Sequence, residues 1–284
     1  QGLFSKEHQG LLHDLSTNNY NKLYFFQEQN ELILSVTKYL KKNNKNCEIC
    51  LFQDGLKPYN RMKGYSFGMF KWDLRTWRWL WRNGIKEIKP IKLLNTKRYA
   101  YTDEVDYVHL TFPEAYINWN NKKLVKIDFI DHNKFKPALE KIFRWDQNLL
   151  PISHNAILYM TKPVLHNPSL EFEFLKKLKH NLDRPLVLKL HPKTSNEDLT
   201  RYKGLGEDVF IINSLLPGEL FIMNLTNSII VSWNSTSLFY NSPSNRYYYV
   251  ANLFRDKIKR LQRYDFTESP SKHIKMVDHI EEIC

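Results

Sequence analysis

Glycine is scarce in this sequence, with 9 residues among 284, and the glycine-rich signatures of common nucleotide-binding folds are missing. The segment Gly204-Leu205-Gly206 lacks a third glycine and does not follow an expected strand, so it is not a dinucleotide-binding fingerprint. The sequence also has no P-loop, no His-Glu-x-x-His and no Asp-x-Asp of the kind that holds a metal–diphosphate pair. An enzyme of this sequence that uses a nucleotide is therefore expected to work without a divalent ion.

Cysteine is also rare, and its three residues do not form a disulfide framework. Cys47 and Cys50 form a Cys-x-x-Cys within a strand-like run, where residues three apart face opposite sides of a sheet. No second Cys or His pair completes a zinc site, so we expect both thiols to be structural. No run of 18 apolar residues occurs and no signal-peptide pattern opens the sequence, and these features favour a reducing cytoplasm.

Acidic residues are outnumbered, since 42 Lys and Arg face 30 Asp and Glu, for a formal charge of +12. This excess favours a polyanionic ligand or partner; a well-solvated basic surface is the alternative. The stretch 57–98 interleaves basic and aromatic residues, which suits a charged polymer that carries rings. The helical spacing of Trp77, Leu80 and Trp81 leaves open that these aromatics form a core face instead.

Expected strands and helices alternate along the chain, which predicts α/β domains with parallel sheets. Residues 1–22 show only a weak pattern. The strands are expected at 23–26, 47–52, 107–112, 156–160, 185–190, 209–212, 227–233 and 247–250. The helices are expected at 31–42, 135–143, 170–182, 196–202, 217–223, from 238 onward and at 273–283. A linker near 145–155 divides the chain into an N-terminal domain, 1–150, and a C-terminal domain, 151–284, whose last helix is a candidate to pack back on the first domain.

Polar residues follow several strands of the second predicted sheet. Pro192 fixes its own backbone and holds His191 out of helical geometry at the end of the strand 185–190. Glu219 and the pair Ser235-Thr236 lie at neighbouring strand-to-helix corners. Each feature taken alone has a structural explanation: a turn for His191-Pro192, a first-turn charge favoured by the helix dipole for Glu219, and an N-cap for Ser235-Thr236. Together they predict a nucleotide site, with hydroxyls for a phosphate, a carboxylate for a ribose and an imidazole for a leaving phosphate oxygen.

An acidic-acidic-Gly type of turn, then His-Pro, then a Ser-Ser/Thr pair resembles the pattern of bacterial sialyltransferases. The basic and aromatic first half is most similar to their capsular polysialyltransferase family. The resemblance implies a GT-B fold of two Rossmann-like domains facing a central cleft. It places the acceptor on the first domain and CMP-sialic acid, a donor substrate and not a cofactor, on the second. It also implies an anionic polysaccharide as acceptor, and a capsule synthesis or export complex at the inner membrane as a further candidate partner.

The resemblance assigns the donor-side roles residue by residue. His191 falls on the general acid, Ser235 and Thr236 on the pair that binds the CMP phosphate, and Glu219 on the carboxylate at the ribose. Lys189 matches a residue near the cytidine, and Thr161 and Pro192 complete the donor set. No metal ligand is implied.

The base position departs from the family pattern, because the acidic-acidic-Gly turn reads Gln53-Asp54-Gly55 here. A carboxylate accepts the proton of an attacking hydroxyl, whereas the neutral amide of Gln53 does not. We therefore expect Gln53 to be an isosteric replacement of the catalytic Glu that inactivates this chain, with Asp54 as the alternative base. The residues predicted to contact the acceptor are Gly55, Lys57, Arg61, Lys63, Lys71 and Arg75.

The resulting hypothesis is an inverting, metal-independent transfer of sialic acid from CMP-sialic acid to the non-reducing end of polysialic acid. A lipooligosaccharide acceptor is the alternative within the same class. A nucleic-acid-binding protein that uses 57–98 is the alternative of another class, although the sequence shows no aromatic RNA-binding motif and nucleic acid is not an expected partner. The expected location is cytoplasmic, with peripheral attachment to the inner membrane as the further candidate.

Overall fold

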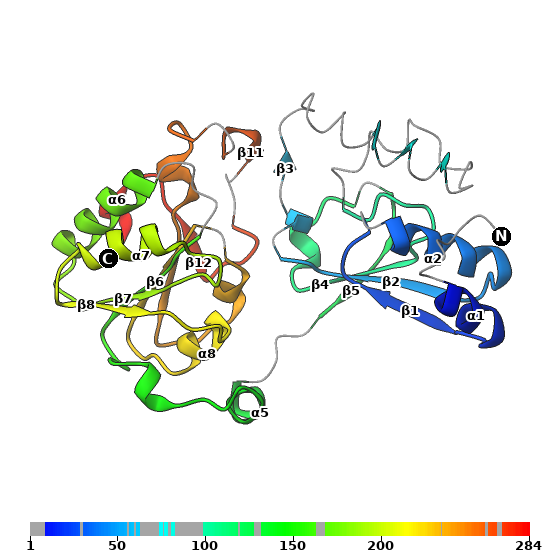
Figure 1. Cartoon of the computed structure of the whole chain (residues 1–284). Helices are drawn as coiled ribbons and strands as arrows, with labels where there is room; N and C mark the ends of the chain where they lie inside the picture. Colours follow the sequence, from blue (N-terminus) through cyan, green and yellow to red (C-terminus); the bar gives the residue numbers. More distant parts are fainter. Residues whose placement is uncertain are drawn as a thin grey trace. The chain divides into compact units, whose positions relative to one another are not determined.

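The computed structural model describes residues 9–28, 31–55, 57–59, 61–62, 74–75, 77–78, 81–82, 99–118, 120–127, 132–162, 168–233, 235–258, 261–265 and 269–284. The chain divides into two compact units, Gln1–Asp128 and Phe129–Cys284 (Figure 1). Each unit is an α/β domain built on its own parallel sheet, so the expected two Rossmann-like domains are confirmed.

The N-terminal unit contains a four-stranded parallel sheet. Its strands lie in chain order, β1 (Lys22–Phe25), β2 (Glu48–Phe52), β4 (Tyr107–Leu110) and β5 (Lys123–Lys126). The helices α1 (Gln9–Thr17) and α2 (Glu31–Asn43) pack on one face of this sheet through apolar residues such as Leu15, Val36 and Leu40. The shorter described elements of this unit are η2 (Lys57–Tyr59), β3 (Arg61–Met62) and η3 (Pro113–Ala115).

Alternation along the strands separates the two faces of this sheet. Phe25, Ile49, Leu51, Val108 and Leu110 are buried in the cluster beneath the helices. The intervening residues of the same strands point to the opposite face. The sheet therefore presents one apolar face to its helices and a second face of different composition.

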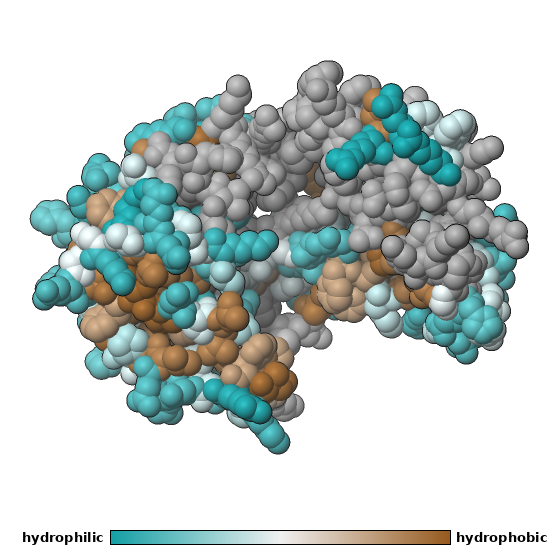
Figure 2. Space-filling model, viewed as in Figure 1, coloured by the Kyte–Doolittle hydropathy of each residue, from teal (hydrophilic) through white to brown (hydrophobic). Residues whose placement is uncertain are grey.

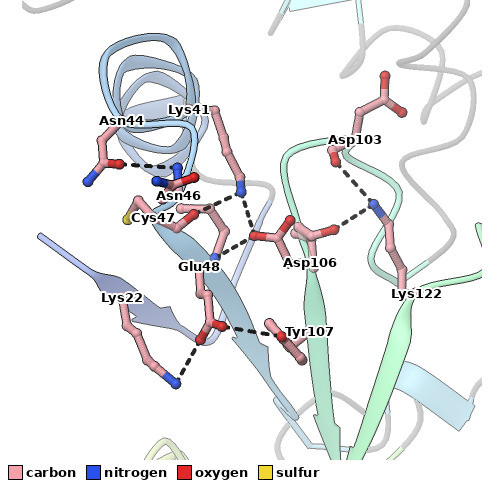
Figure 3. A network of polar contacts seen from close by, with 12 residues as sticks. Lys22, Lys41, Asn44, Asn46, Cys47, Glu48, Asp103, Asp106, Tyr107 and Lys122 are labelled. Atoms are coloured by element: carbon pink, nitrogen blue, oxygen red, sulfur yellow. Dashed lines mark hydrogen bonds and ion pairs between the residues drawn. The ribbon is translucent and has the colours of Figure 1, made fainter.

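Ion pairs hold the amino ends of these strands together (Figure 3). Asp106 accepts a hydrogen bond from the Ile49 backbone N–H at 2.8 Å and pairs with the Lys41 ammonium at 2.6 Å. The Lys122 ammonium donates to the backbone carbonyls of Thr102 and Val105 at 2.8 and 2.7 Å. These contacts join α2, β2 and the strands beside it at the end of the sheet away from residue 53.

The C-terminal unit is built on a six-stranded parallel sheet in the order β12-β10-β9-β6-β7-β8. The chain starts at the central β6, builds outward to β8, then returns to β9 on the other side of β6, which is the strand order of a Rossmann domain. The topological switch point lies between β6 and β9. The strands are β6 (Ile157–Met160), β7 (Leu186–Lys189), β8 (Val209–Ile212), β9 (Ile229–Ser232), β10 (Arg246–Tyr249) and β12 (Ile274–Met276).

Every residue of β6, β7 and β9 is buried, as expected for parallel strands covered on both faces. The helices are α5 (His132–Phe143), α6 (Pro168–Asn181), α7 (Asn196–Lys203) and α8 (Gly218–Met223). The short elements are η4 (Gln147–Leu149), η5 (Thr236–Phe239), η6 (Ala251–Phe254), η7 (Leu261–Arg263), β11 (Tyr264–Asp265) and η8 (Ile280–Glu282). Among the described residues, no helix is both long and apolar enough to cross a bilayer.

The division between the units falls after Asp128, earlier than the expected boundary at 150. The reason is that α5 and the residues after it belong to the second unit. The Trp145 ring packs edge-to-face on Phe221 of α8, with centroids 5.1 Å apart, and Asn224 donates a hydrogen bond to Glu140 at 3.1 Å. The sequence predicts a linker from 145 onward, because the contacts that hold this segment on α8 come from residues distant in the chain and leave no local sequence pattern.

The expected C-terminal helix at 273–283 is wrong. Ile274–Met276 forms the edge strand β12, which pairs in parallel with β10, and a single 3-10 turn follows it. Ile283 is buried in the core of the C-terminal unit, so this segment belongs to that unit. The helix expected from Leu238 onward is likewise a 3-10 turn, η5, while α1 and β5 were not expected at all.

The packing of Trp145 on α8 gives a test of the unit boundary. We expect Trp145→Ala to weaken the α5–α8 contact and to raise amide exchange in α8 while leaving β1, β2 and β4 unchanged. Hydrogen–deuterium exchange measured by mass spectrometry separates these peptides. Equal changes in the N-terminal sheet, or none in α8, would contradict the assignment of α5 to the C-terminal unit.

Candidate functional site

The predicted donor residues lie at the carboxyl ends of neighbouring strands in the C-terminal sheet. Thr161 follows β6, His191 follows β7, and the pair Ser235-Thr236 follows β9. Because β6 pairs with both β7 and β9, these three corners are adjacent in the sheet. Glu219 lies in α8, the helix that follows the outer strand β8. Ligands of open α/β sheets bind at this edge, beside the switch point.

Backbone contacts hold the His191 corner in place. The His191 N–H donates to the Thr161 hydroxyl at 2.9 Å, and the Thr161 N–H donates to the Lys189 carbonyl at 3.1 Å. The His191 carbonyl accepts from the Thr194 N–H at 2.9 Å, which closes a tight turn around Pro192. The corner is therefore a hydrogen-bonded turn that fixes the backbone from which the His191 side chain extends.

The imidazole of His191 is held in one tautomer. Its Nδ1 accepts a hydrogen bond from the Lys193 backbone N–H at 3.1 Å, so the proton of the neutral ring sits on Nε2. Partial burial, then the charges of Lys193, Lys189 and Lys162, lower the pKa of His191. At neutral pH the ring is uncharged and offers an Nε2–H donor, and an incoming anion would offset the lysine charges and raise its basicity.

Lys189 is nearly fully buried, with 5% of its surface exposed. Its ammonium donates to the carbonyls of Leu190 at 2.9 Å and Ser214 at 2.6 Å, and lies 5.5 Å from the centre of the Phe221 ring. Burial lowers the pKa of Lys189 to about 8, although the Glu219 charge opposes this shift. Lys189 therefore ties the end of β7 to the loop after β8.

Glu219 has a partner that the sequence did not suggest. The Ser237 hydroxyl donates to Glu219 Oε1 at 2.9 Å, while the Ser235 hydroxyl caps η5 by accepting from the Ser237 N–H at 3.3 Å. Thr236 is the first residue of η5. The signal that could have identified Ser237 is its place in the same Ser-Thr-Ser turn.

Gly218 allows the start of α8 to approach this turn closely. A Cβ at position 218 would lie 2.8 Å from the Met160 sulfur and 2.9 Å from the Ser237 hydroxyl. Any other residue there would force the Met160 and Ser237 side chains, or the start of α8, to shift. The close approach explains why a glycine, rare in this chain, stands just before the carboxylate.

A buried carboxylate joins the loops that carry the donor-side residues. Glu171 of α6 has 2% of its surface exposed and accepts hydrogen bonds from the hydroxyls of Tyr159 at 2.6 Å and Tyr202 at 2.5 Å. The Lys162 backbone N–H also bonds to it, and Trp233 donates its indole N–H to the Tyr159 hydroxyl. Burial raises the pKa of Glu171, and the tyrosine hydroxyls oppose that shift.

This network connects three separate segments. Lys162 follows Thr161, Tyr202 lies in the helix after the His191 corner, and Trp233 precedes the Ser235 turn. One carboxylate thus fixes the loops after β6 and β9 and the helix after β7 relative to one another. Nothing in the local sequence around Glu171 indicates this role.

In the N-terminal unit, Gln53 follows β2, and its amide oxygen accepts two hydrogen bonds. Oε1 accepts from the Tyr59 hydroxyl at 2.6 Å and from the Thr111 N–H at 2.9 Å. The Tyr59 hydroxyl in turn accepts from the Phe112 N–H at 3.0 Å, and burial raises the pKa of Tyr59 to about 12. A Glu at position 53 fits the same two donors with one oxygen and leaves its second oxygen in place of the amide NH₂.

Asp54 makes a different contact, accepting from the Gln27 side-chain amide at 2.9 Å. Gly55 has φ of 63°, in the left-handed region, a conformation that glycine adopts at little cost, so the turn after β2 favours glycine at this position. Of the predicted acceptor cations, Arg75 has an exposed side chain, Lys57 and Arg61 are described through their backbone in η2 and β3, and Lys63 and Lys71 lie outside the described residues.

The described residues contain no group of three or more His, Cys, Asp or Glu side chains placed to hold a metal ion. Cys47 and Cys50 are buried free thiols whose pKa is raised, mainly by burial. The polar groups at the carboxyl edge of the C-terminal sheet are hydroxyls, a carboxylate and an imidazole, a set suited to a phosphate and a ribose.

The described residues form two parallel α/β units, and the second has the strand order of a Rossmann domain. The model of the alpha-2,8-polysialyltransferase (POLYST) family matches residues 9–246. The chain belongs to this family.

The chain is also similar to a solved sialyltransferase from Photobacterium damselae, a structure of residues 113–497 described as the GT-B domain. The two share 13% identity over 87% of this chain and 75% of the other, with a TM-score of 0.45. Comparison with curated proteins gives no match.

The Glu171 network predicts a specific defect. Replacing Glu171 with Gln puts an amide NH₂ where three donors converge, which leaves a buried donor unpaired at a cost of about 1–3 kcal/mol. We expect Glu171→Gln to lower the melting temperature and to raise amide exchange at 161–162 and 233–237 well below that temperature.

The matched control is Leu175→Ala on the same helix, a fully buried position outside the network, where a cavity costs about 2–5 kcal/mol. This control is expected to lower stability without loosening those loops. If Glu171→Gln and Leu175→Ala raised amide exchange at the two loops equally, Glu171 would contribute only to the general stability of the unit.

Proposed function

We propose that this chain is a polysialyltransferase whose donor is CMP-sialic acid and whose acceptor is the non-reducing end of polysialic acid. The observation that carries the proposal is the His191 corner, where an Nε2–H donor stands at the carboxyl edge of a Rossmann sheet in a chain of the polysialyltransferase family. The reaction is an inverting transfer without a metal ion.

The donor-side roles follow from the chemistry of each group. Ser235, Thr236 and the backbone of their turn bind the CMP phosphate, and Glu219, held by Ser237, binds ribose hydroxyls. His191 donates from Nε2 to the phosphate oxygen that leaves the anomeric carbon. The lysines around the corner favour an anionic leaving group there.

The transfer itself is a single displacement. The acceptor hydroxyl oxygen forms a bond to the anomeric carbon while the bond from that carbon to the CMP phosphate oxygen breaks, and CMP leaves with the electron pair. The hydroxyl proton passes to the base, and His191 hydrogen-bonds or protonates the departing phosphate. The transition state has the oxocarbenium character of glycosyl transfer.

The base belongs at residue 53. The contacts of Gln53 with Tyr59 and Thr111 hold a side chain of this shape in one orientation, so a Glu would keep one oxygen fixed and present the other. With an amide at this place, the chain keeps the shape of the site and lacks most of its activity. Asp54, bonded to Gln27, is the alternative base.

The acceptor and the location are also part of the proposal. A carboxylate on each sugar complements the chain's charge of +12. A lipooligosaccharide is the alternative acceptor and is separated from the first by the dependence of transfer on acceptor length. The cytoplasmic location and peripheral attachment to a capsule complex at the inner membrane remain predictions.

Donor binding gives the first test. CMP is expected to raise the melting temperature of this chain, and uridine, adenosine and guanosine monophosphates much less. His191→Asn should weaken CMP binding, and the difference from the parent should grow as pH falls, because binding raises the lowered pKa of His191 and takes up a proton. Calorimetry measures both. The absence of any preference for CMP would sink the donor assignment.

Restoring the base gives the second test. We expect Gln53→Glu to increase transfer of sialic acid to an oligosialic acceptor by about two to four orders of magnitude, the usual contribution of general acid–base catalysis. Transfer should persist in EDTA. Asp54→Asn in the same background is the control, since the proposal assigns Asp54 no proton transfer. A rate unchanged by Gln53→Glu and abolished by Asp54→Asn would make Asp54 the base.

A further inference from the structure

The second face of the N-terminal sheet carries a group of aromatic rings. Tyr24 of β1, Phe26 just after β1, Phe52 of β2 and His109 of β4 make up this group, which we call the aromatic face. The parallel register sets Phe52 beside His109, and alternation directs these residues away from the face that α1 and α2 cover.

The four rings form one continuous cluster. Phe52 and His109 stack with centroids 4.3 Å apart and planes 5° from parallel. Tyr24 meets both rings edge-on, at 5.5 and 6.3 Å, and Phe26 lies 5.8 Å from Phe52. Each ring therefore fixes its neighbour, and the cluster is a preformed surface.

The aromatic face is open to solvent. Phe26 exposes 61% of its surface and Tyr24 exposes 54%, so two large rings stay uncovered. Contiguous exposed rings with a polar rim are typical of binding sites. On the described surface of the N-terminal unit, hydrophobic residues lie next to hydrophilic ones in the view of Figure 2. The rim includes Gln27 and Asp54 at one end and the Lys22–Glu48 pair at the other.

The aromatic face is continuous with the turn that holds the candidate base. Phe52 directly precedes Gln53, and the Gln27–Asp54 hydrogen bond joins the residue after Phe26 to that turn. An acceptor whose reacting hydroxyl lies at this turn has further sugars that must lie on the surface nearby. The aromatic face begins at that place.

We propose that the aromatic face binds successive sugar rings of the acceptor oligosaccharide behind its reacting end; this rests on the proposed function. The C–H face of a sugar packs on an aromatic ring, and its hydroxyls need the hydrogen-bonding groups that the rim supplies. Lys123 of β5, which lies on the same face of the sheet, complements the carboxylates of an anionic chain. The continuity of the aromatic face with the turn at residue 53 favours the acceptor chain as its occupant.

The experiment measures binding to the full chain as it stands. The probes are a trimer and a decamer of α2,8-linked sialic acid, CMP, and vesicles that contain an anionic phospholipid. The variants are Phe26→Ala, Phe26→Leu and Tyr24→Ala. Phe143→Ala is the control, because Phe143 is a partly exposed ring in α5 of the other unit. Melting temperatures verify that each variant is folded.

We expect Phe26→Ala and Tyr24→Ala each to weaken decamer binding about five- to tenfold, the order of losing one stacked ring, with a smaller effect on the trimer. Phe26→Leu should weaken it similarly, because leucine is apolar but has no flat ring. CMP affinity and the Phe143→Ala variant should be unchanged.

Several results would overturn the proposal. Decamer affinity that is equal in all variants would show that sugars do not use this face. Loss of vesicle binding or of self-association in Phe26→Ala, with decamer affinity retained, would assign it to a membrane or to a second copy of the chain. A parent chain that binds the decamer and not CMP would reject the donor assignment while leaving this face intact.

Discussion

The carboxyl edge of the C-terminal sheet depends on one buried carboxylate. Glu171 accepts hydrogen bonds from Tyr159 in β6, from the backbone N–H of Lys162 just after β6, and from Tyr202 in the helix after β7. A buried charge is stable when it is fully hydrogen-bonded, and removing one donor leaves the remainder uncompensated. The loops at the carboxyl edge of the sheet are therefore fixed as a group.

The fixed loops explain how a single histidine can have a defined protonation state. Thr161, held by its neighbours, accepts the His191 N–H, and the turn that follows delivers the Lys193 N–H to Nδ1. The tautomer is thus set by the backbone. Partial burial and the lysines nearby disfavour the imidazolium, so an anion bound beside the ring would raise its basicity.

The sequence predicted the periodic parts of the fold and the corners that follow them. The strands β6, β7 and β9, which are buried on both faces, were recognisable from their apolar runs, and His-Pro marked the end of β7. The strand order then brought Thr161, His191 and Ser235 to adjacent corners, as expected from parallel strands.

What the sequence did not reveal depends on contacts between distant segments. Glu171 pairs with tyrosines 12 and 31 residues away, and no local pattern distinguishes it from a surface acid on an amphipathic helix. The segment at 273–283 resembled a helix, but pairing with β10 made it an edge strand. Trp145 lay in an expected linker because its partner is a helix formed much later in the chain.

The two halves of the proposed chemistry are built independently. The acid side, at His191, is stabilised by contacts within the C-terminal unit, and the base side, at Gln53, by Tyr59 and Thr111 in the N-terminal unit. Because each of these sets of contacts lies within its own unit, an amide at residue 53 changes none of the contacts that hold His191. In the proposed mechanism, the amide therefore separates binding from chemistry: a chain with Gln53 should hold the donor nucleotide as well as an active chain does and fail in the proton transfer alone.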